Sequence, residues 1–329
     1  MVSMKNRAEA ARLNREITLK GMEHGGTTVA VIGQKGCGKT TELLQLANGV
    51  AHVDPYDGMT YKDTVVWLAQ GYDYWNSIPD QSRIHLHFHK NSPVRLVNER
   101  FEPDDFGVAK RRMHTYKDAK QLLSRLVPYA INVIYEPTEW LFSPLVQLHE
   151  RREEPFGRQA IERYTFQSLD DLVFEGSLFF YELLHVLRTR KHRDQFVSVF
   201  ADEAGRIFPM YPAGRRFMLQ AWLIQSEVIH LRRMNISLYL AAHGTSSIDS
   251  RLHDKIQYWI WMRGARIRKD SPVYRYRTNV LEPGEAIIES GMFGDFKVPD
   301  LVRRGLVIAE YQREIESAKK EEDASMGYA

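Results

Sequence analysis

The sequence predicts an α/β fold with a mostly parallel central sheet flanked by helices. Apolar, β-branched segments alternate along the chain with segments of helical periodicity, which is the pattern of strands joined by crossover helices. The chain has 329 residues, of which 43% are hydrophobic and 26% are charged. This length and composition are enough to bury one large core or two small ones.

The sequence has a single cysteine, which limits the kinds of site it can form, and its net charge of +3 is only mildly basic. One cysteine excludes an internal disulfide framework and any zinc site built from several cysteines. The sequence has no uninterrupted apolar run long enough to cross a bilayer, and its charged start lacks the apolar core of a signal peptide. We therefore expect a cytoplasmic protein without a membrane span.

The expected elements follow one another in a regular order. Strands are expected over residues 27–33, 63–69, 83–89, 131–136, 196–205, 236–243, 256–264 and 284–290, and helices over 4–22, 39–50, 116–127, 173–190 and 214–233. These elements predict an N-terminal helix within residues 1–25 and one α/β core over residues 26–310. They leave an insertion or lid around 137–172 and a charged tail over 311–329.

The first strand and helix of the core have the clearest patterns. Residues 27–33, TTVAVIG, are β-branched and apolar, as in a strand buried on both faces. The helix at 39–50 places Leu43, Leu44 and Leu46 on what we expect to be its inner side. A glycine-rich segment joins the two.

The strand expected over residues 83–89 alternates apolar side chains with histidines. Its sequence, RIHLHFH, predicts one apolar face and one wetter face that carries His85, His87 and His89. The three histidines could also be metal ligands. We favour simple alternation, because it produces the same spacing.

The glycine-rich segment GQKGCGKT (residues 33–40) matches the pattern G-x-x-x-x-G-K-[ST]. Glycines let the backbone wrap closely around phosphate oxygens, and the following helix adds the positive end of its dipole. Lys39 would reach the β- and γ-phosphates, and the Thr40 hydroxyl would bind Mg²⁺. The predicted ATP-binding residues are Gly33, Gln34, Lys35, Gly36, Cys37, Gly38, Lys39, Thr40 and Thr41. Within them, Cys37 is either a small filler or a thiol made reactive by the start of the helix.

A pair of carboxylates follows a later apolar strand, in VSVFADEAG. Asp202 would support Mg²⁺ from the side opposite Thr40, behind the direct ligands or through a bound water. Glu203, where the backbone turns at the end of the strand, would orient and deprotonate an attacking water. The alternative is an Asp-Glu pair at the start of a helix without a ligand. Together with the phosphate loop, the pair favours hydrolysis over transfer to a small acceptor.

The order of these motifs resembles the HerA/FtsK superfamily of DNA-pumping ATPases. The resemblance lies in the phosphate loop, in DEAGRIFP, in RRMNISLYLAAHGTSSID, in IQYWIWMR and in EPGEAIIESGMFGDFKVPDL. It covers roughly residues 26–45 and 196–300, while 52–195 match no motif. It implies a RecA-like (ASCE) P-loop NTPase core, in which the Asp-Glu strand lies beyond a neighbour of the phosphate-loop strand.

The resemblance also implies roles for residues after the acidic pair. His243 stands at the end of the strand where the family usually has a glutamine sensor for the nucleotide. Arg232 and Arg233 stand where the family places an arginine finger, which acts on the neighbouring subunit. They could equally cap a helix C-terminus. Arg263 and Arg266 are weaker finger candidates.

The function that this resemblance implies is ATP hydrolysis coupled to the movement of double-stranded DNA. The expected form is a hexameric ring, with basic runs such as KRR at 110–112 tracking phosphates. A viral genome-packaging ATPase fits a chain with one motor core, in the host cytoplasm or with the virion, and with a capsid or channel protein as a further partner. The alternatives are an assembly or switch ATPase that acts on a protein, and a conjugative or plasmid DNA-transfer ATPase.

Overall fold

The computed structural model of the chain describes most of the expected core. The described residues are 25–51, 63–69, 71–138, 178–191, 195–210, 224, 228–274, 277–290, 293–298 and 304–311. The expected N-terminal helix, nearly all of the insertion at 137–172 and the tail beyond residue 311 lie outside them. So does most of the helix expected over 214–233.

A ten-stranded sheet forms the centre of the molecule, with the order β12-β11-β10-β1-β9-β8-β2-β7-β4-β6. The strands from β10 to β6 are parallel to their neighbours, and β11 and β12 are added antiparallel at one edge. The bounds are β1 Thr28–Ile32, β2 Thr64–Ala69, β4 Ile84–His89, β6 Met113–Tyr116, β7 Ile131–Tyr135, β8 Val197–Ala201, β9 Ile236–Ala242, β10 Tyr258–Met262, β11 Glu285–Glu289 and β12 Phe293–Lys297. The mostly parallel sheet predicted from the sequence is confirmed.

The position of β9 in the strand order distinguishes a RecA-like core from other parallel α/β sheets. It lies between β1, which leads into the phosphate loop, and β8, which leads into the acidic pair. Ala242 of β9 is the register partner of Ile32, and Leu240 is the partner of Ala201. One strand therefore separates the two functional strands, as expected for a RecA-like core.

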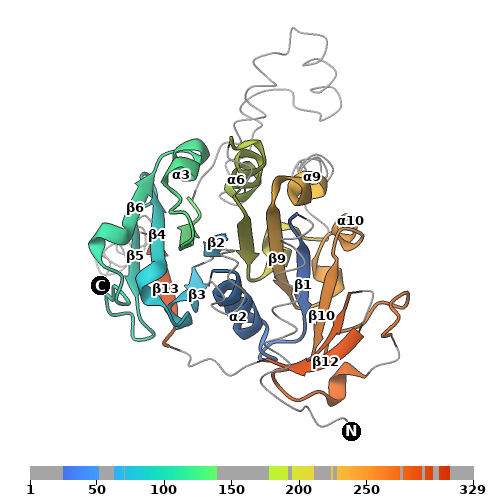
Figure 1. Cartoon of the computed structure of the whole chain (residues 1–329). Helices are drawn as coiled ribbons and strands as arrows, with labels where there is room; N and C mark the ends of the chain where they lie inside the picture. The colour runs from blue at the N-terminus through green and yellow to red at the C-terminus, as the bar shows by residue number, and fades with distance from the viewer. Residues whose placement is uncertain are drawn as a thin grey trace, which may run out of the picture.

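Helices cover both faces of the sheet (Figure 1). Helix α2, Lys39–Ala51, packs Leu43, Leu44 and Leu46 in one apolar core with Val29 and Val31 of β1. On the opposite face, the other core contains Ala30 and Ile32 with side chains of α3 (Ala119–Arg125), α6 (Leu178–Thr189), α7 (Ala204–Ile207), α9 (Ile229–Leu231) and α10 (Ser250–His253). The alternation along β1 thus divides its side chains between two cores.

A small antiparallel sheet completes the described part and was not expected from the sequence. Its order is β3-β13-β5, with β3 Tyr72–Asp73, β13 Val307–Tyr311 and β5 Val94–Val97. The last described strand therefore returns to lie beside strands from the first third of the chain (Figure 1). These strands are short, and their partners are more than 200 residues away.

Two details of the prediction were wrong on the side of β4. The strand itself is confirmed, but His87 and His89 are buried rather than on a wetter face, because side chains of the neighbouring strands β6 and β7 pack against their rings. The helix expected over 116–127 begins at Ala119, because residues 113–116 form edge strand β6. The His87 ring hydrogen-bonds Asn132, with 2.9 Å between Nε2 and Oδ1.

Among the residues that the structure describes, no helix is long and apolar enough to span a bilayer. The same residues contain no group of three or more His, Cys, Asp or Glu side chains that could hold a metal ion.

Candidate active site

The phosphate loop connects β1 to α2 in the way the sequence predicts. Gly36 and Gly38 have φ values of +79° and +107°, which only glycine adopts without strain. The Lys39 ammonium folds back over the loop, and its Nζ donates a 2.9 Å hydrogen bond to the carbonyl oxygen of Gln34. The Lys39 ammonium is therefore held over the loop, at the place where a phosphate would bind.

The phosphate loop leaves no room for a larger residue at Gly33. A Cβ at Gly33 would lie 2.5 Å from the Cys37 Sγ. The Gln34 N–H donates to the carbonyl of Arg263 at 3.0 Å, and the Gly284 N–H donates to that of Cys37 at 2.9 Å. The loop is thus braced by the segments that follow β10 and precede β11.

Cys37 is a filler rather than an activated thiol. Its side chain is buried under the loop. Burial raises the pKa of the thiol, and the nearby Lys39 charge offsets this only in part. The alternative of a reactive cysteine is therefore wrong for this conformation.

Thr40 and Asp202 meet at the point where a metal ion would be held. The Thr40 Oγ1 donates a 2.6 Å hydrogen bond to Asp202 Oδ2. Burial raises the pKa of Asp202, while the Thr40 hydrogen bond and the Lys39 charge lower it. A hydroxyl and a carboxylate are hard oxygen donors of the kind Mg²⁺ takes, so the residues present fit this ion.

Glu203 follows Asp202 in a left-handed backbone conformation, with φ 62° and ψ 53°. For a residue other than glycine this conformation costs roughly 1–2 kcal/mol. It turns the chain directly from β8 into α7, whose first residue is Ala204. The negative charge of Glu203 also raises the pKa of Asp202, so the two carboxylates act on one another. The turn expected at the end of the strand is present.

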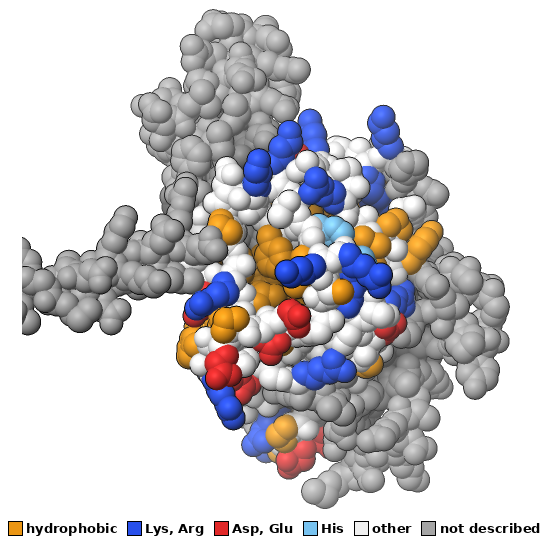
Figure 2. All heavy atoms as spheres, turned by 90° about the vertical axis from the view of Figure 1, so that its left-hand side faces the viewer, with side chains coloured by type: hydrophobic (Ala, Val, Ile, Leu, Met, Phe, Trp, Pro, Cys, Tyr) orange, Lys and Arg blue, Asp and Glu red, His pale blue; other side chains and the backbone are white. Residues whose placement is uncertain are grey.

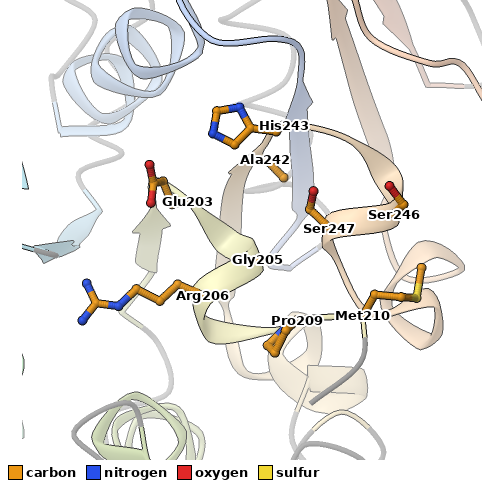
Figure 3. A pocket seen from close by; sticks show the side chains of 9 residues that line it. All are labelled: Glu203, Gly205, Arg206, Pro209, Met210, Ala242, His243, Ser246 and Ser247. Carbon is orange, nitrogen blue, oxygen red and sulfur yellow. The ribbon is translucent and has the colours of Figure 1, made fainter. Parts of the chain in front are cut away.

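A pocket of about 430 Å³ opens beside the acidic pair. Figure 3 shows its lining, with Glu203 on one side and His243, Ser246 and Ser247 on the other. The His243 ring is exposed, and its Nδ1 lies 3.5 Å from the Nζ of Lys39. Since β9 ends between β1 and β8, His243 stands between the phosphate loop and Glu203, as a sensor would.

The predicted finger residues Arg232 and Arg233 do not join this site. Both are exposed in a 3₁₀ turn at Arg232–Met234, just before β9 begins. They lie at the amino end of the seven-residue strand, and a strand of that length spans roughly 23 Å. A role in the same subunit's site is therefore excluded by distance, and a role toward a neighbouring subunit stays a prediction.

The structure adds a residue that sequence reasoning missed. Asp73 is buried and accepts hydrogen bonds from Trp67 Nε1 and from the Tyr74 N–H, both at 2.9 Å. Burial raises its pKa to about 7, and the charge of Asp202 contributes to the rise. A second buried carboxylate thus lies near enough to Asp202 for the two charges to interact. No local motif marks it, because the chain returns to this place only through the small sheet.

A second missed feature is an ion pair between Arg206 of α7 and Glu136, which directly follows β7. The Glu136 side chain is 7% exposed and that of Arg206 is 47% exposed. The pair links the turn that carries Glu203 to a strand two places away in the sheet. The two residues are 70 positions apart, so no sequence pattern pairs them.

Comparisons with known proteins give distant likenesses. No protein-family model and no curated protein matches the sequence. Among solved structures, the genome packaging NTPase B204 from Sulfolobus turreted icosahedral virus 2 in complex with sulfate is 12% identical, with 83% of this chain and 96% of that chain covered and a TM-score of 0.41. The N-terminal domain of the zonular occludens toxin from Neisseria meningitidis is 11% identical, with coverages of 85% and 93% and a TM-score of 0.29.

The cytoplasmic domain of the Type VII secretion ATPase EccC from Thermomonospora curvata is 12% identical to the chain, with a TM-score of 0.33. That alignment covers 87% of this chain and 24% of the other. At such identities the fold is assigned from the chain itself, by its phosphate loop and by the place of β9 between β1 and β8. The chain has the RecA-like P-loop NTPase fold.

Proposed function

We propose that this chain hydrolyses ATP with Mg²⁺ and uses the energy to move double-stranded DNA. The observation that carries the hydrolase proposal is the convergence of Lys39, Thr40, Asp202, Glu203 and His243 at the carboxyl ends of three adjacent parallel strands. Open parallel sheets bind ligands at this edge. Phosphoryl transfer to water requires groups that bind the phosphates, hold Mg²⁺ and orient the attacking water, and this set contains a candidate for each.

Each residue has a separate task in this proposal. Lys39 and the loop N–H groups bind the β- and γ-phosphates, and Thr40 with Asp202 holds Mg²⁺, which neutralises phosphate charge. Glu203 accepts a proton from the attacking water. His243 donates a hydrogen bond to the γ-phosphate or orients the water.

The test of this site is Glu203→Gln, which keeps the shape of the side chain and removes its basicity. We expect turnover to fall by roughly 10²- to 10⁴-fold while ATP binding is retained. Glu282→Gln, at an exposed position before β11, is the matched control. Full turnover in Glu203→Gln would show that another group activates the water.

A surface away from the site supports a polyanionic partner. Residues 110–125, which run through β6 into α3 at the edge of the sheet, contain six Lys or Arg and a single Asp. Figure 2 looks onto this edge and shows Lys and Arg side chains spread over its upper part. The exposed members are Lys110, Arg111, Lys117, Lys120 and Arg125. We call these five residues the cationic strip.

Few of these charges are neutralised by neighbouring carboxylates. Arg125 donates to the backbone carbonyl of Thr115, which leaves its charge in place. Within the described residues, Lys117 alone of the five has an ion pair, at 3.9 Å from Asp118. Unneutralised cations along one edge suit contact with a phosphate backbone, whose affinity depends on counterion release rather than on sequence.

Stimulation by DNA is the measurement that separates the candidate functions. We expect double-stranded DNA to raise the ATPase rate, and the triple variant Lys110→Glu, Arg111→Glu, Lys117→Glu to lose part of this stimulation and to bind DNA with a shallower salt dependence. The control reverses three exposed charges elsewhere: Arg100→Glu, Lys255→Glu and Arg277→Glu. An ATPase without any DNA stimulation would favour a protein-directed assembly ATPase. Mass measurements with and without nucleotide test the hexameric ring.

A further inference from the structure

The conformation of Glu203 depends on how firmly the following helix is held. Its left-handed backbone is one that residues other than glycine avoid, and such conformations persist where the surroundings hold them. Helix α7 is only four residues long, so it adds little rigidity of its own. The contacts around α7 therefore decide where the Glu203 carboxylate points.

Three contacts hold α7 and the residue that follows it from one side. The Tyr181 Oη donates to the carbonyl of Ile207 at 2.7 Å, and the Asp249 N–H donates to that of Phe208 at 2.9 Å. Gly205 packs so closely on the loop after β9 that an added Cβ would lie 2.8 Å from the Ser247 carbonyl oxygen. These contacts fix the helix from the side of β9 and α6.

Arg206 holds α7 from the other side. Its backbone N–H closes the turn by donating to the Glu203 carbonyl at 2.9 Å. Its guanidinium extends away from His243 and the pocket serines, as Figure 3 shows, and forms the ion pair with Glu136. The same residue thus closes the turn of Glu203 and ties it to the end of β7.

Glu136, the partner of Arg206, is itself held in place by hydrogen bonds to its segment of the chain. Its carboxylate is buried, and its carbonyl accepts a 2.8 Å hydrogen bond from the Tyr311 Oη of β13. The preceding carbonyl, of Tyr135, accepts one from Tyr116 at 2.6 Å. The end of β7 is therefore held by both sheets, while Arg206 is the side chain that reaches it from α7.

We propose that Arg206 is a positioning residue for Glu203, and that it acts through its ion pair with Glu136. The pair keeps the turn at Glu203 in its left-handed conformation, so that the carboxylate faces the phosphate site before substrate binds. This inference rests on the proposed function, because it takes Glu203 as the group that accepts the proton of the attacking water. Arg206 lines the pocket beside Glu203, but its guanidinium extends away from His243 and pairs with Glu136.

The test compares Arg206→Ala, Arg206→Lys and Glu136→Gln with wild type. In Arg206→Ala and Glu136→Gln we expect kcat to fall by roughly 10- to 100-fold, the loss that a small misplacement of a catalytic group produces. The dissociation constant for ATP should stay within about twofold, because the phosphate loop is untouched. Arg206→Lys restores most of kcat, since it keeps the charge that pairs with Glu136.

The matched control is Arg251→Ala. Arg251 also pairs with a buried carboxylate, that of Asp249, whose side chain is 3% exposed. Asp249 contacts α7 through its backbone N–H, so losing the Arg251 side chain leaves this contact in place. We expect kcat of this variant to equal that of wild type.

The double variant Glu203→Gln, Arg206→Ala separates positioning from a general loss of structure. If Arg206 acts through Glu203, adding Arg206→Ala to Glu203→Gln lowers kcat no further. A further loss in the double variant, an Arg206→Ala kcat within about twofold of wild type, or an equal fall in ATP affinity would each overturn the inference. If Arg206→Ala does not fold, Glu136→Gln carries the same comparison.

Failure of the proposed function gives a different result. It appears as full turnover in Glu203→Gln alone, whatever Arg206 does. When Glu203→Gln is inactive and both Arg206→Ala and Glu136→Gln turn over like wild type, the positioning inference alone is wrong.

Discussion

Thr40 and Asp202 lie 162 residues apart in the chain and are joined by a 2.6 Å hydrogen bond between Oγ1 and Oδ2. The threonine lies in the first turn of α2, and the aspartate directly follows β8. Because β9 lies between β1 and β8 in the sheet, the hydrogen bond spans the carboxyl end of β9. In the proposed function, the Thr40 oxygen would bind Mg²⁺ and Asp202 would support the ion from the other side, directly or through a water. Without the ion, the hydrogen bond from the Thr40 hydroxyl keeps the two side chains together.

Removing the Thr40 hydroxyl tests this pair. We expect Thr40→Ala to weaken the apparent affinity for Mg²⁺ in ATP hydrolysis by roughly 10- to 100-fold, because one oxygen ligand is lost. Thr40→Ser keeps the hydroxyl and should behave like wild type. The measurement is ATPase rate against Mg²⁺ concentration at saturating ATP. Equal Mg²⁺ dependence in all three proteins would show that Thr40 is no ligand.

Gly205→Ala should destabilise the protein. The added Cβ would lie 2.8 Å from the Ser247 carbonyl oxygen, a backbone atom that cannot move freely. We expect a loss of about 1–3 kcal/mol in the free energy of unfolding, measured with urea, together with a lower kcat. Gly49→Ala in α2 is the control, because a Cβ there meets nothing within 4 Å. That change should stabilise by roughly 0.5–1 kcal/mol.

The buried carboxyl of Asp63 should make the free energy of unfolding depend on pH. Burial raises the pKa of this carboxyl from its ordinary 3.8 to about 6, although Ser198 donates a hydrogen bond to it. Between about pH 4 and 6 the folded chain therefore holds a proton that the unfolded chain has released. Stability contributed by this group is full below that window and falls as pH rises through it.

Asp63→Asn removes this dependence. The amide oxygen can still accept from Ser198, and no charge is buried above pH 6. At pH 8 we expect the variant to be more stable than wild type by on the order of 2 kcal/mol, and at pH 4 we expect the two to be alike. Urea denaturation at the two pH values measures this. The exposed Asp254→Asn is the control, and a constant difference across pH would contradict the prediction.

His243 should tolerate glutamine better than alanine. Its Nδ1 lies 3.5 Å from the Lys39 Nζ, at a place where a hydrogen-bonding group can reach the γ-phosphate. His243→Ala should lower kcat by roughly 10²- to 10³-fold. His243→Gln should stay within about tenfold of wild type, because an amide donates the same kind of hydrogen bond. If both variants lose equal activity, the ring itself is needed rather than a donor.

Mixing experiments test the trans role predicted for Arg232 and Arg233. Both lie at the opposite end of β9 from the nucleotide site of the same chain. If they act on a neighbour, Arg232→Ala, Arg233→Ala mixed with Lys39→Ala should recover part of the ATPase rate, because some interfaces combine an intact loop with an intact finger. Neither inactive protein alone shows this activity. No recovery in mixtures that co-assemble would leave helix capping as their role.

The local motifs were predicted well because each is complete within a short stretch. The loop at 33–40 and the strands at 27–33, 131–136 and 236–243 carry their signal in adjacent residues, so strand, turn and helix follow from composition alone. The place of β9 between β1 and β8 was predicted from the resemblance and is confirmed by the register.

The missed features depend on pairs that are far apart in the chain. Strand β5, Val94–Val97, is four residues long and becomes a strand only beside β13. Asp73 and Arg206 acquire their roles from Asp202 and Glu136, which no spacing rule links to them. His87 is buried because its ring packs on His114 of β6 and hydrogen-bonds Asn132 of β7, and a periodic pattern in one strand does not reveal its neighbours.

The small sheet gives the order of synthesis a consequence for the candidate site. Val307 pairs with Asp73, and the Tyr311 hydroxyl donates to the carbonyl of Glu136, so Asp73 and the partner of Arg206 are both held by residues that leave the ribosome after all the others described. Contacts of such separation form late, because the loop between them must close first. A growing chain would thus carry a complete phosphate loop long before these two carboxylates are held in place, which happens only when translation has passed β13.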